Sequence, residues 1–255
     1  MHFQSDPTAL IFSGMIYELI VILVSSLVLT LIFLKYQERK HKLTLYLLLI
    51  FTFYLVAIFF SWLSKVLVLY SGIEYLESGA TSEPGTFASY ILLRIANFRF
   101  SFVFLTIAIY LSYVLKVNIF DNGIYNEFQR MIISIYAVFT GIYCFFVYSL
   151  TAVLLDVLAF LFVFVFMLVV YLPFLIDAYS SYKNVSKKGV KTAFASLMLM
   201  SFSFIMILFS FLIDRILIFM GSPGFTIWYF MAWTWGIIGI FGTYYGYIRP
   251  GRKKE

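Results

Sequence analysis

Seven ionisable side chains lie within or beside the long apolar runs of this sequence, where a helix that only faces lipid would carry none. They are Glu18, Lys65, Arg94, Arg99, Asp156, Asp214 and Arg215. Each costs about 3 kcal/mol at the centre of a bilayer on insertion scales, so such residues normally face a bundle interior and pair with one another. We therefore expect a buried polar layer with four cations and three anions. A bound anion, a ligand carboxylate or one of the loop residues Glu74, Glu77 and Glu83 could balance the remaining positive charge.

Helical spacing supports an inward-facing cluster, because polar residues in three apolar runs repeat at intervals that keep them on one helix face. The three faces are Ser196, Ser203, Ser210 and Asp214; Tyr54, Ser61 and Lys65; and Arg94, Asn97 and Ser101. Arg99 lies about 140° around the helix from Arg94. One of these two arginines is therefore expected to face a cavity and the other a neighbouring helix or the headgroups.

These residues predict a ligand-binding site in one half of a helix bundle. The predicted site comprises Glu18, Lys65, Arg94, Asn97, Asp156, Ser210, Asp214 and Arg215. The alternative is that the cluster only fixes helix packing and that the long side chains reach the interface by snorkelling.

The composition defines the environment in which such a cluster must form. Of the 255 residues, 63% are hydrophobic and 12% are charged, whereas soluble domains carry about a quarter charged residues. The chain is therefore predicted to be an all-α integral membrane protein. The single cysteine, Cys144, excludes an internal disulfide.

Hydropathy predicts seven membrane-spanning helices in a single domain over residues 1–255, with no soluble domain, because about 20 apolar residues cross a bilayer. The predicted spans are residues 10–34, 43–70, 88–115, 131–150, 153–177, 192–219 and 226–248. The fourth and fifth spans form one apolar run, and Ser149 and Thr151 mark the expected turn between them. The first run is too long for a cleavable signal and is taken as a retained span. The layout resembles that of receptors and rhodopsins.

Lysine and arginine predict the orientation. The connections after the first, third and fifth spans and the C-terminal tail hold 14 of the 18 basic residues, whereas the second connection holds only acidic charges. The N-terminus is therefore expected outside and the C-terminus inside a cell membrane. The net charge of +6 then makes the inner face attractive to anionic lipids, and nucleic-acid binding is not indicated.

Two sequence echoes suggest an internal repeat. IFFSWLSK, ending at Lys65, matches ILFSFLID, ending at Asp214, and IAIYLSY in the third span matches IGIFGTY in the seventh. A parallel 3+1+3 repeat would follow, with the fourth span as the linker. Lys65 and Asp214 would then lie at equivalent positions and could pair across the central axis.

Small residues and one proline mark two further features. Gly236, Gly239, Gly242 and Gly246 form a small-residue face on the seventh span, as expected for close helix packing. Pro173 is expected to bend the fifth span near its inner end.

Several kinds of chemistry have no residues to carry them, so we expect neither an enzyme nor a cofactor-binding protein. The two histidines, His2 and His41, lie outside the predicted spans, which argues against an intramembrane haem, a zinc site or a serine–histidine protease. The seventh span contains no lysine that could attach retinal. Asp156 and Asp214 lack the GxGD context of intramembrane aspartyl proteases.

The stretches RIANFRFSF, starting at Arg94, and YYGYIRPGRKK, starting at Tyr244, carry a family resemblance. The sequence resembles uncharacterised archaeal seven-helix membrane proteins and, more distantly, the seven-helix sensory regions of prokaryotic histidine kinases. This resemblance implies a sensory module, and because the sequence stops soon after the seventh span, its effector is expected to be a separate cytoplasmic protein.

Three functions remain open on this basis. The first is a receptor-like sensor whose outward cavity, lined by Lys65, Arg94, Asp214 and Arg215, binds a small anionic or zwitterionic ligand. The second is a secondary transporter or ion pathway built from three-helix repeats. The third is a structural subunit of a membrane complex. Because ionisable groups are rare in the predicted inner halves of the spans, a one-sided pocket is favoured over a conduction path.

Overall fold

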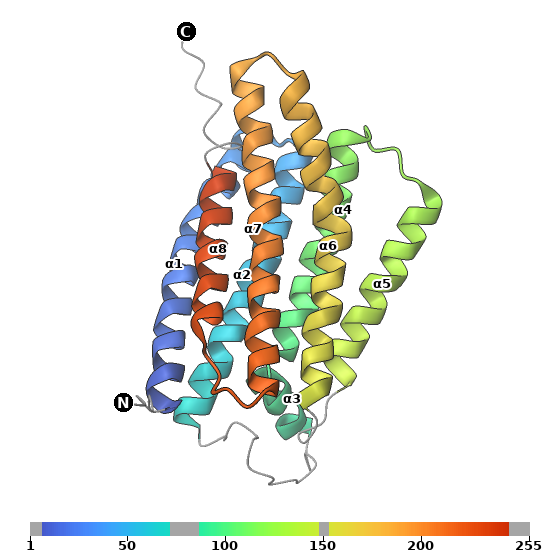
Figure 1. Ribbon diagram of the computed structural model, residues 1–255. Helices are drawn as coiled ribbons and strands as arrows, with labels where there is room; N and C mark the ends of the chain where they lie inside the picture. The colour runs from blue at the N-terminus through green and yellow to red at the C-terminus, as the bar shows by residue number, and fades with distance from the viewer. Residues whose placement is uncertain (1–6, 72–86, 148–152, 245–255) are drawn as a thin grey trace.

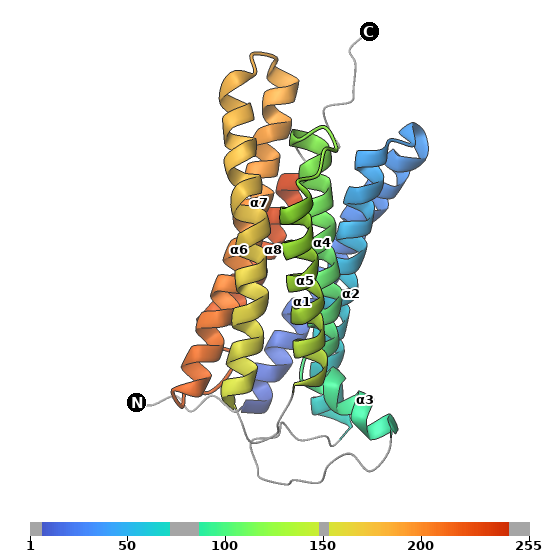
Figure 2. The same ribbon diagram turned by 90° about the vertical axis from the view of Figure 1, so that its right-hand side faces the viewer.

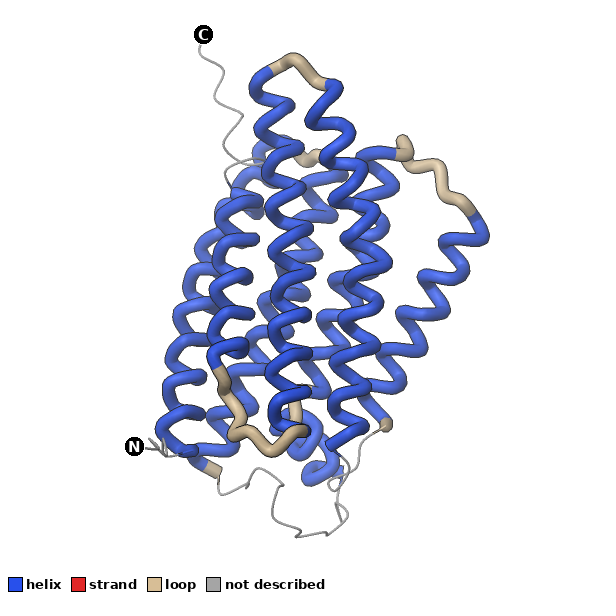
Figure 3. The backbone as a smooth tube through the Cα atoms, in the orientation of Figure 1, coloured by secondary structure: helices blue, strands red, loops and turns tan. Residues whose placement is uncertain are grey.

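The computed structural model describes residues 7–71, 87–147 and 153–244, and within these ranges the chain forms helices and no strands (Figures 1 and 3). The helices are α1 (Pro7–Arg39), α2 (Lys42–Tyr70), α3 (Phe87–Ala96), α4 (Arg99–Phe120), α5 (Glu127–Phe146), α6 (Val153–Asn184), α7 (Lys188–Phe219) and α8 (Ile227–Thr243). The predicted turn at Ser149 and Thr151 and the acidic loop with Glu74, Glu77 and Glu83 lie outside the described residues.

Six of these helices, α1, α2, α4, α5, α6 and α7, are long and apolar enough to cross a membrane, and α8 is a shorter apolar helix. Apolar side chains such as Leu27 and Ile135 are more than half exposed on the outside of this helical assembly. Lipid is the solvent that accommodates such a surface. The chain is therefore a multi-pass helical membrane protein.

The helices form a closed ring. In order around the ring, α1, α2, α4, α6, α7 and α8 each pack against the next, and α8 packs against α1. The Tyr17 and Thr234 hydroxyls, 2.9 Å apart, join α1 to α8. Helix α5 lies outside the ring against α4 and α6 and diverges from α6 toward the end where residues 185–187 connect α6 to α7 (Figures 1 and 2). We call this the hairpin end of the bundle.

The predicted third span is wrong in one respect, because it is broken into α3 and α4. The break falls at Asn97 and Phe98, and Phe98 adopts a left-handed conformation with φ of 62°. A left-handed non-glycine residue costs roughly 1–2 kcal/mol, and neither glycine nor proline marks the position. As a result, α3 is a ten-residue helix beside the bundle, and α4 alone forms the crossing.

The other predicted spans correspond to single helices with shifted ends. Helix α1 extends beyond both predicted bounds, and α6 continues through Pro173 to Asn184. The fourth predicted span begins earlier, at Glu127, and the described α8 ends at Thr243.

The predicted small-residue face of α8 is confirmed at Gly239 and Gly242, which contact α7, whereas Gly246 lies outside the described residues. A Cβ atom built on Gly239 would lie 3.0 Å from the Cβ of Ser203, and one on Gly242 would lie 2.9 Å from a methyl carbon of Leu199. The Ser196 hydroxyl donates a hydrogen bond to the Gly242 carbonyl oxygen. The absence of side chains therefore sets the distance between these two helices.

Candidate functional site

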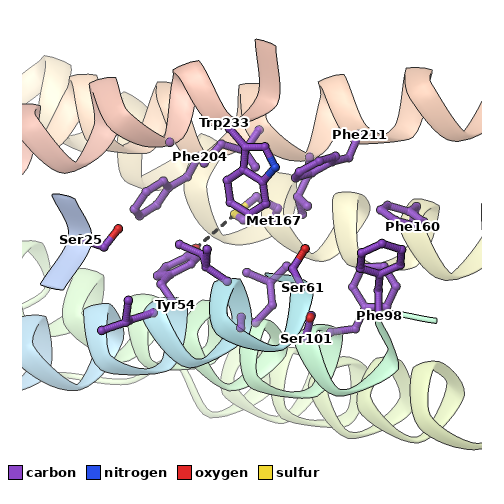
Figure 4. A pocket seen from close by; sticks show the side chains of 18 of the residues that line it. Ser25, Tyr54, Ser61, Phe98, Ser101, Phe160, Met167, Phe204, Phe211 and Trp233 are labelled. Carbon is purple, nitrogen blue, oxygen red and sulfur yellow. Dashed lines mark hydrogen bonds between the residues drawn. The ribbon is translucent and has the colours of Figure 1, made fainter. Parts of the chain in front are cut away.

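A cavity of about 90 Å³ lies inside the ring and is lined by residues from all six of its helices (Figure 4). Its walls are mostly apolar and rich in aromatic residues, which include Phe51, Phe98, Phe160, Phe211 and Trp233. The volume equals the share of about three water molecules in the liquid. The cavity therefore suits a small ligand with an apolar body.

A buried ion pair joins α1 to α2 at the end of the bundle opposite the hairpin. Lys65 Nζ lies 2.9 Å from Glu18 Oε1, and both side chains have zero exposure. The same carboxylate oxygen accepts hydrogen bonds of 2.7 Å from the hydroxyls of Ser61 and Tyr229. Because Ser61 and Tyr229 also line the cavity, the pair is separated from it by one layer of side chains. Glu18 Oε2 is buried with no hydrogen-bond partner among the described residues.

Three aromatic rings surround the Lys65 ammonium group. Its Nζ lies 4.6 Å from the ring centroid of Phe98, 5.3 Å from that of Tyr229 and 5.7 Å from that of Phe225. Phe98 and Phe225 both have left-handed backbones, with φ of 62° and 60°. Backbone strain of this kind persists only where the surroundings determine the conformation. Burial of the two rings against a cation provides such a constraint, since cation–π contacts strengthen when water is removed.

A second ionic cluster links α4, α6 and α7. Asp156 lies 2.9 Å from Arg99 and 3.5 Å from Arg215. The Arg215 guanidinium group also lies 5.1 Å from the Phe98 ring centroid and 4.9 Å from that of Phe160. Arg215 is one of the residues that line the cavity, so this cluster lies next to it.

Asp214 has a local structural role. Its Oδ1 accepts a hydrogen bond of 2.9 Å from the backbone N–H of Thr226 and one of 2.6 Å from the Thr226 hydroxyl. Thr226 is the N-cap residue of α8, so Asp214 holds the connection that starts this helix. The prediction that Lys65 and Asp214 pair across the central axis is therefore wrong: Lys65 pairs with Glu18.

Arg94 and Asn97 do not line the cavity. The Arg94 Nε donates to the Phe145 carbonyl oxygen at 2.9 Å in the last turn of α5, where a positive charge is favourable. The Asn97 side-chain amide donates to the Leu93 carbonyl oxygen at 2.8 Å. Neither Arg94 nor Arg99 therefore faces the cavity, contrary to the prediction for one of them. The broken helix is the reason, because it changes the angular relation between the two side chains.

Most residues of the predicted inward faces are buried, but few of them make the predicted contacts. Ser203, Ser210 and Asp214 of α7 are at most 1% exposed, and Tyr54 and Ser61 of α2 are also buried. Ser210 is buried without lining the cavity. Of the eight predicted site residues, Arg215 alone lines it.

Two polar groups outside the predicted site line the cavity from opposite sides, Ser101 on α4 and Trp233 on α8 (Figure 4). Ser101 Oγ and Trp233 Nε1 are buried with no hydrogen-bond partner among the described residues. Leaving a polar group unsatisfied costs about 1–3 kcal/mol, which a ligand or water in the cavity would offset. Ser101 shares the Arg94 face in the sequence, but Trp233 carries no signal that separates it from an interfacial anchor.

A chain of hydroxyl groups lies beside the cavity on its hairpin side. The Tyr54 and Tyr171 hydroxyls are 3.1 Å apart, and the Ser112 hydroxyl lies 2.6 Å from that of Tyr171. Tyr54 lines the cavity, whereas Tyr171 and Ser112 are fully buried in the core. The chain thus ties α2, α6 and α4 together next to any ligand.

Among the described residues, no three histidine, cysteine, aspartate or glutamate side chains gather as metal ligands would. In comparisons with known proteins, no family model, curated protein or solved structure matches this chain.

Proposed function

We propose that this protein is a receptor-like membrane sensor that binds a small acid with an apolar body in the cavity of its helical ring. The observation that carries the proposal is the aromatic-rich cavity with Arg215 among its lining residues and two buried groups, Ser101 and Trp233, that have no hydrogen-bond partner within the described part of the chain. A ligand carboxylate would accept hydrogen bonds from guanidinium and indole N–H groups, which only donate. Aromatic walls would cover its apolar part.

The distribution of charge supports a one-sided site. The two ionic clusters lie at the end of the bundle opposite the hairpin, whereas the core toward the hairpin holds apolar side chains such as Ile32, Leu47 and Leu115. An ion crossing that apolar region would lose its hydration without replacement. In the orientation predicted from lysine and arginine, the two ionic clusters would lie in the outer half and the hairpin in the cytoplasm.

Helices α6 and α7 would transmit ligand binding. Both contribute cavity residues, including Phe160 and Arg215, and both continue to the hairpin end. A ligand that changed the packing of Arg215 would act on α7 directly and on α6 through Asp156. A ligand that changed the packing of Tyr54 would act on α6 through the Tyr171 hydroxyl. A separate effector would detect this change.

A secondary transporter is the second candidate, and the order of the helices favours it. Around the ring, α1 stands opposite α6, α2 opposite α7 and α4 opposite α8. These are the pairs that the proposed 3+1+3 repeat would relate, with α5 outside the ring as the linker, and transporters of this kind bind substrate between their repeats. A structural subunit is the third candidate, supported by the mutual pairing of the buried charges.

A ligand screen with a matched pair of variants tests the proposal. Small carboxylic acids would be screened by thermal unfolding of the purified protein in lipid nanodiscs, and hits repeated on Ala57→Leu and Ala88→Leu. Ala57 lines the cavity, whereas Ala88 is exposed on α3. We expect the stabilisation by a hit to disappear in Ala57→Leu and to persist in Ala88→Leu.

Two outcomes would count against the sensor. A hit that stabilises both variants equally does not occupy the cavity. Concentrative uptake of a hit into proteoliposomes, lost in Ala57→Leu, would favour the transporter instead.

A further inference from the structure

The hairpin formed by α6 and α7 projects beyond the other helices at the hairpin end (Figure 1). Each of its two helices has 32 residues. At a rise of 1.5 Å per residue each is about 48 Å long, whereas the hydrocarbon core of a bilayer is about 30 Å thick. About 18 Å of each helix must therefore lie outside the hydrocarbon.

The excess length emerges at the hairpin end. Asp156 and Arg215 lie near the ends of α6 and α7 that are farthest from the hairpin turn, and they pair with each other there. Charged groups at that position mark the level of the other interface, because they are costly at greater depth. Helix α4, the partner of α6 in the ring, has only 22 residues, about 33 Å. Its last residue, Phe120, stacks on Phe194 of α7 at 6.0 Å, so α4 ends before the turn of the hairpin.

The projecting tip carries one sign of charge. Residues 178–195, which we call the hairpin tip, contain the lysines 183, 187, 188 and 191 and no acidic residue. Lys187 and Lys188 are exposed, and Lys183 and Lys191 lie over the rings of tyrosines 179 and 182, at 4.4 and 4.7 Å. The nearest acid along the chain, Asp177, lies 3.0 Å from Lys116 of α4. None of the four lysines has an ion-pair partner among the described residues.

Distance from the bilayer separates two sources of negative charge. Measured from Asp156 and Arg215, the two helices run about 41 Å to the hairpin end, about 11 Å more than the hydrocarbon thickness. Headgroups occupy about 6 Å of that length, so the exposed pair Lys187 and Lys188 stands roughly 5 Å farther out. Lipid phosphates at that distance lie within the Debye length of about 8 Å and attract these lysines only from a distance. A charged group in the aqueous phase can instead approach these lysines directly.

We propose that the hairpin tip binds an acidic segment of a soluble partner protein. The site deepens the proposed function, because it assigns the surface at which a receptor-like protein would contact its effector, but its test requires no cavity ligand. Opposite charges on the partner would steer association and set the register of docking. If the hairpin tip bound no acidic peptide, the proposal of a ligand in the cavity would be unaffected. If the ligand screen gave no hit, the proposal of a docking surface at the hairpin tip would be unaffected.

The test uses a fluorescein-labelled helical peptide with glutamates along one face, titrated by anisotropy against the protein in zwitterionic nanodiscs. The variant is Lys187→Gln with Lys188→Gln. The matched control, Lys40→Gln with Lys42→Gln, removes the same charge from the connection between α1 and α2 and from the first residue of α2. Thermal unfolding would verify that both double variants remain folded.

We expect the hairpin variant to lose about tenfold in peptide affinity, since an exposed ion pair contributes up to about 1 kcal/mol, and the control to change less than twofold. The same values are expected in nanodiscs that contain phosphatidylserine. Equal losses in both variants, or no binding by the wild-type protein, would overturn the proposal. Loss of peptide binding in the phosphatidylserine nanodiscs would also overturn it, because the lysines would then be occupied by lipid.

Discussion

Substitution of Lys65 by methionine tests the ion pair on which the polar cluster is built. The change preserves an unbranched side chain but leaves Glu18 buried with its charge uncompensated, since both side chains have zero exposure. Removing one partner of a buried pair typically costs about 3 to 5 kcal/mol. Lys65→Met also removes the cation from its cage of Phe98, Phe225 and Tyr229. We expect the free energy of unfolding, measured in mixed micelles, to fall by about 4 kcal/mol.

Two further variants separate this effect from a general loss of charge. In Lys65→Met combined with Glu18→Gln, no unpaired charge is left and an amide can still accept the Ser61 and Tyr229 hydrogen bonds, so most of the loss should be recovered. Lys35→Met removes the lysine of an exposed pair with Glu38 and should cost less than about 1 kcal/mol. If the Lys65 and Lys35 variants lost similar stability, or if the double variant were no better than Lys65→Met alone, the ion pair would not hold α1 to α2.

Three other substitutions and one control test contacts between helices, each by its free energy of unfolding. Gly239→Val should cost at least about 2 kcal/mol because its side chain would collide with α7, whereas Gly141→Val on α5, where a Cβ meets nothing within 4 Å, should cost less than about 1 kcal/mol. Asp214→Asn should cost about 1 kcal/mol by weakening the cap of α8, and an unchanged stability would contradict that role. Tyr171→Phe should cost about 1 to 2 kcal/mol because it interrupts the buried hydroxyl chain. An increase in stability would mean that the hydroxyl chain destabilises the folded protein.

Hydrophobicity and charge were sufficient to predict the membrane class, most of the helices and the inward faces. Bilayer thickness requires about 20 apolar residues per crossing, and a buried charge must face other protein groups, so both properties are written in linear order. This is why the burial of Lys65, Glu18 and Asp214 was expected before their surroundings were known. The close packing of Gly239 followed from the same local logic.

The partners of these residues depended on the three-dimensional arrangement. Complementary charge allowed Lys65 to pair with any of three acids, and the choice of Glu18 followed from α1 standing next to α2 in the ring. The break at Phe98 had no local signal, since the contacts that stabilise a left-handed phenylalanine come from α2 and α7. Periodicity specifies which side of a helix is buried, whereas only the packing of distant segments decides which groups meet there and where a cavity remains.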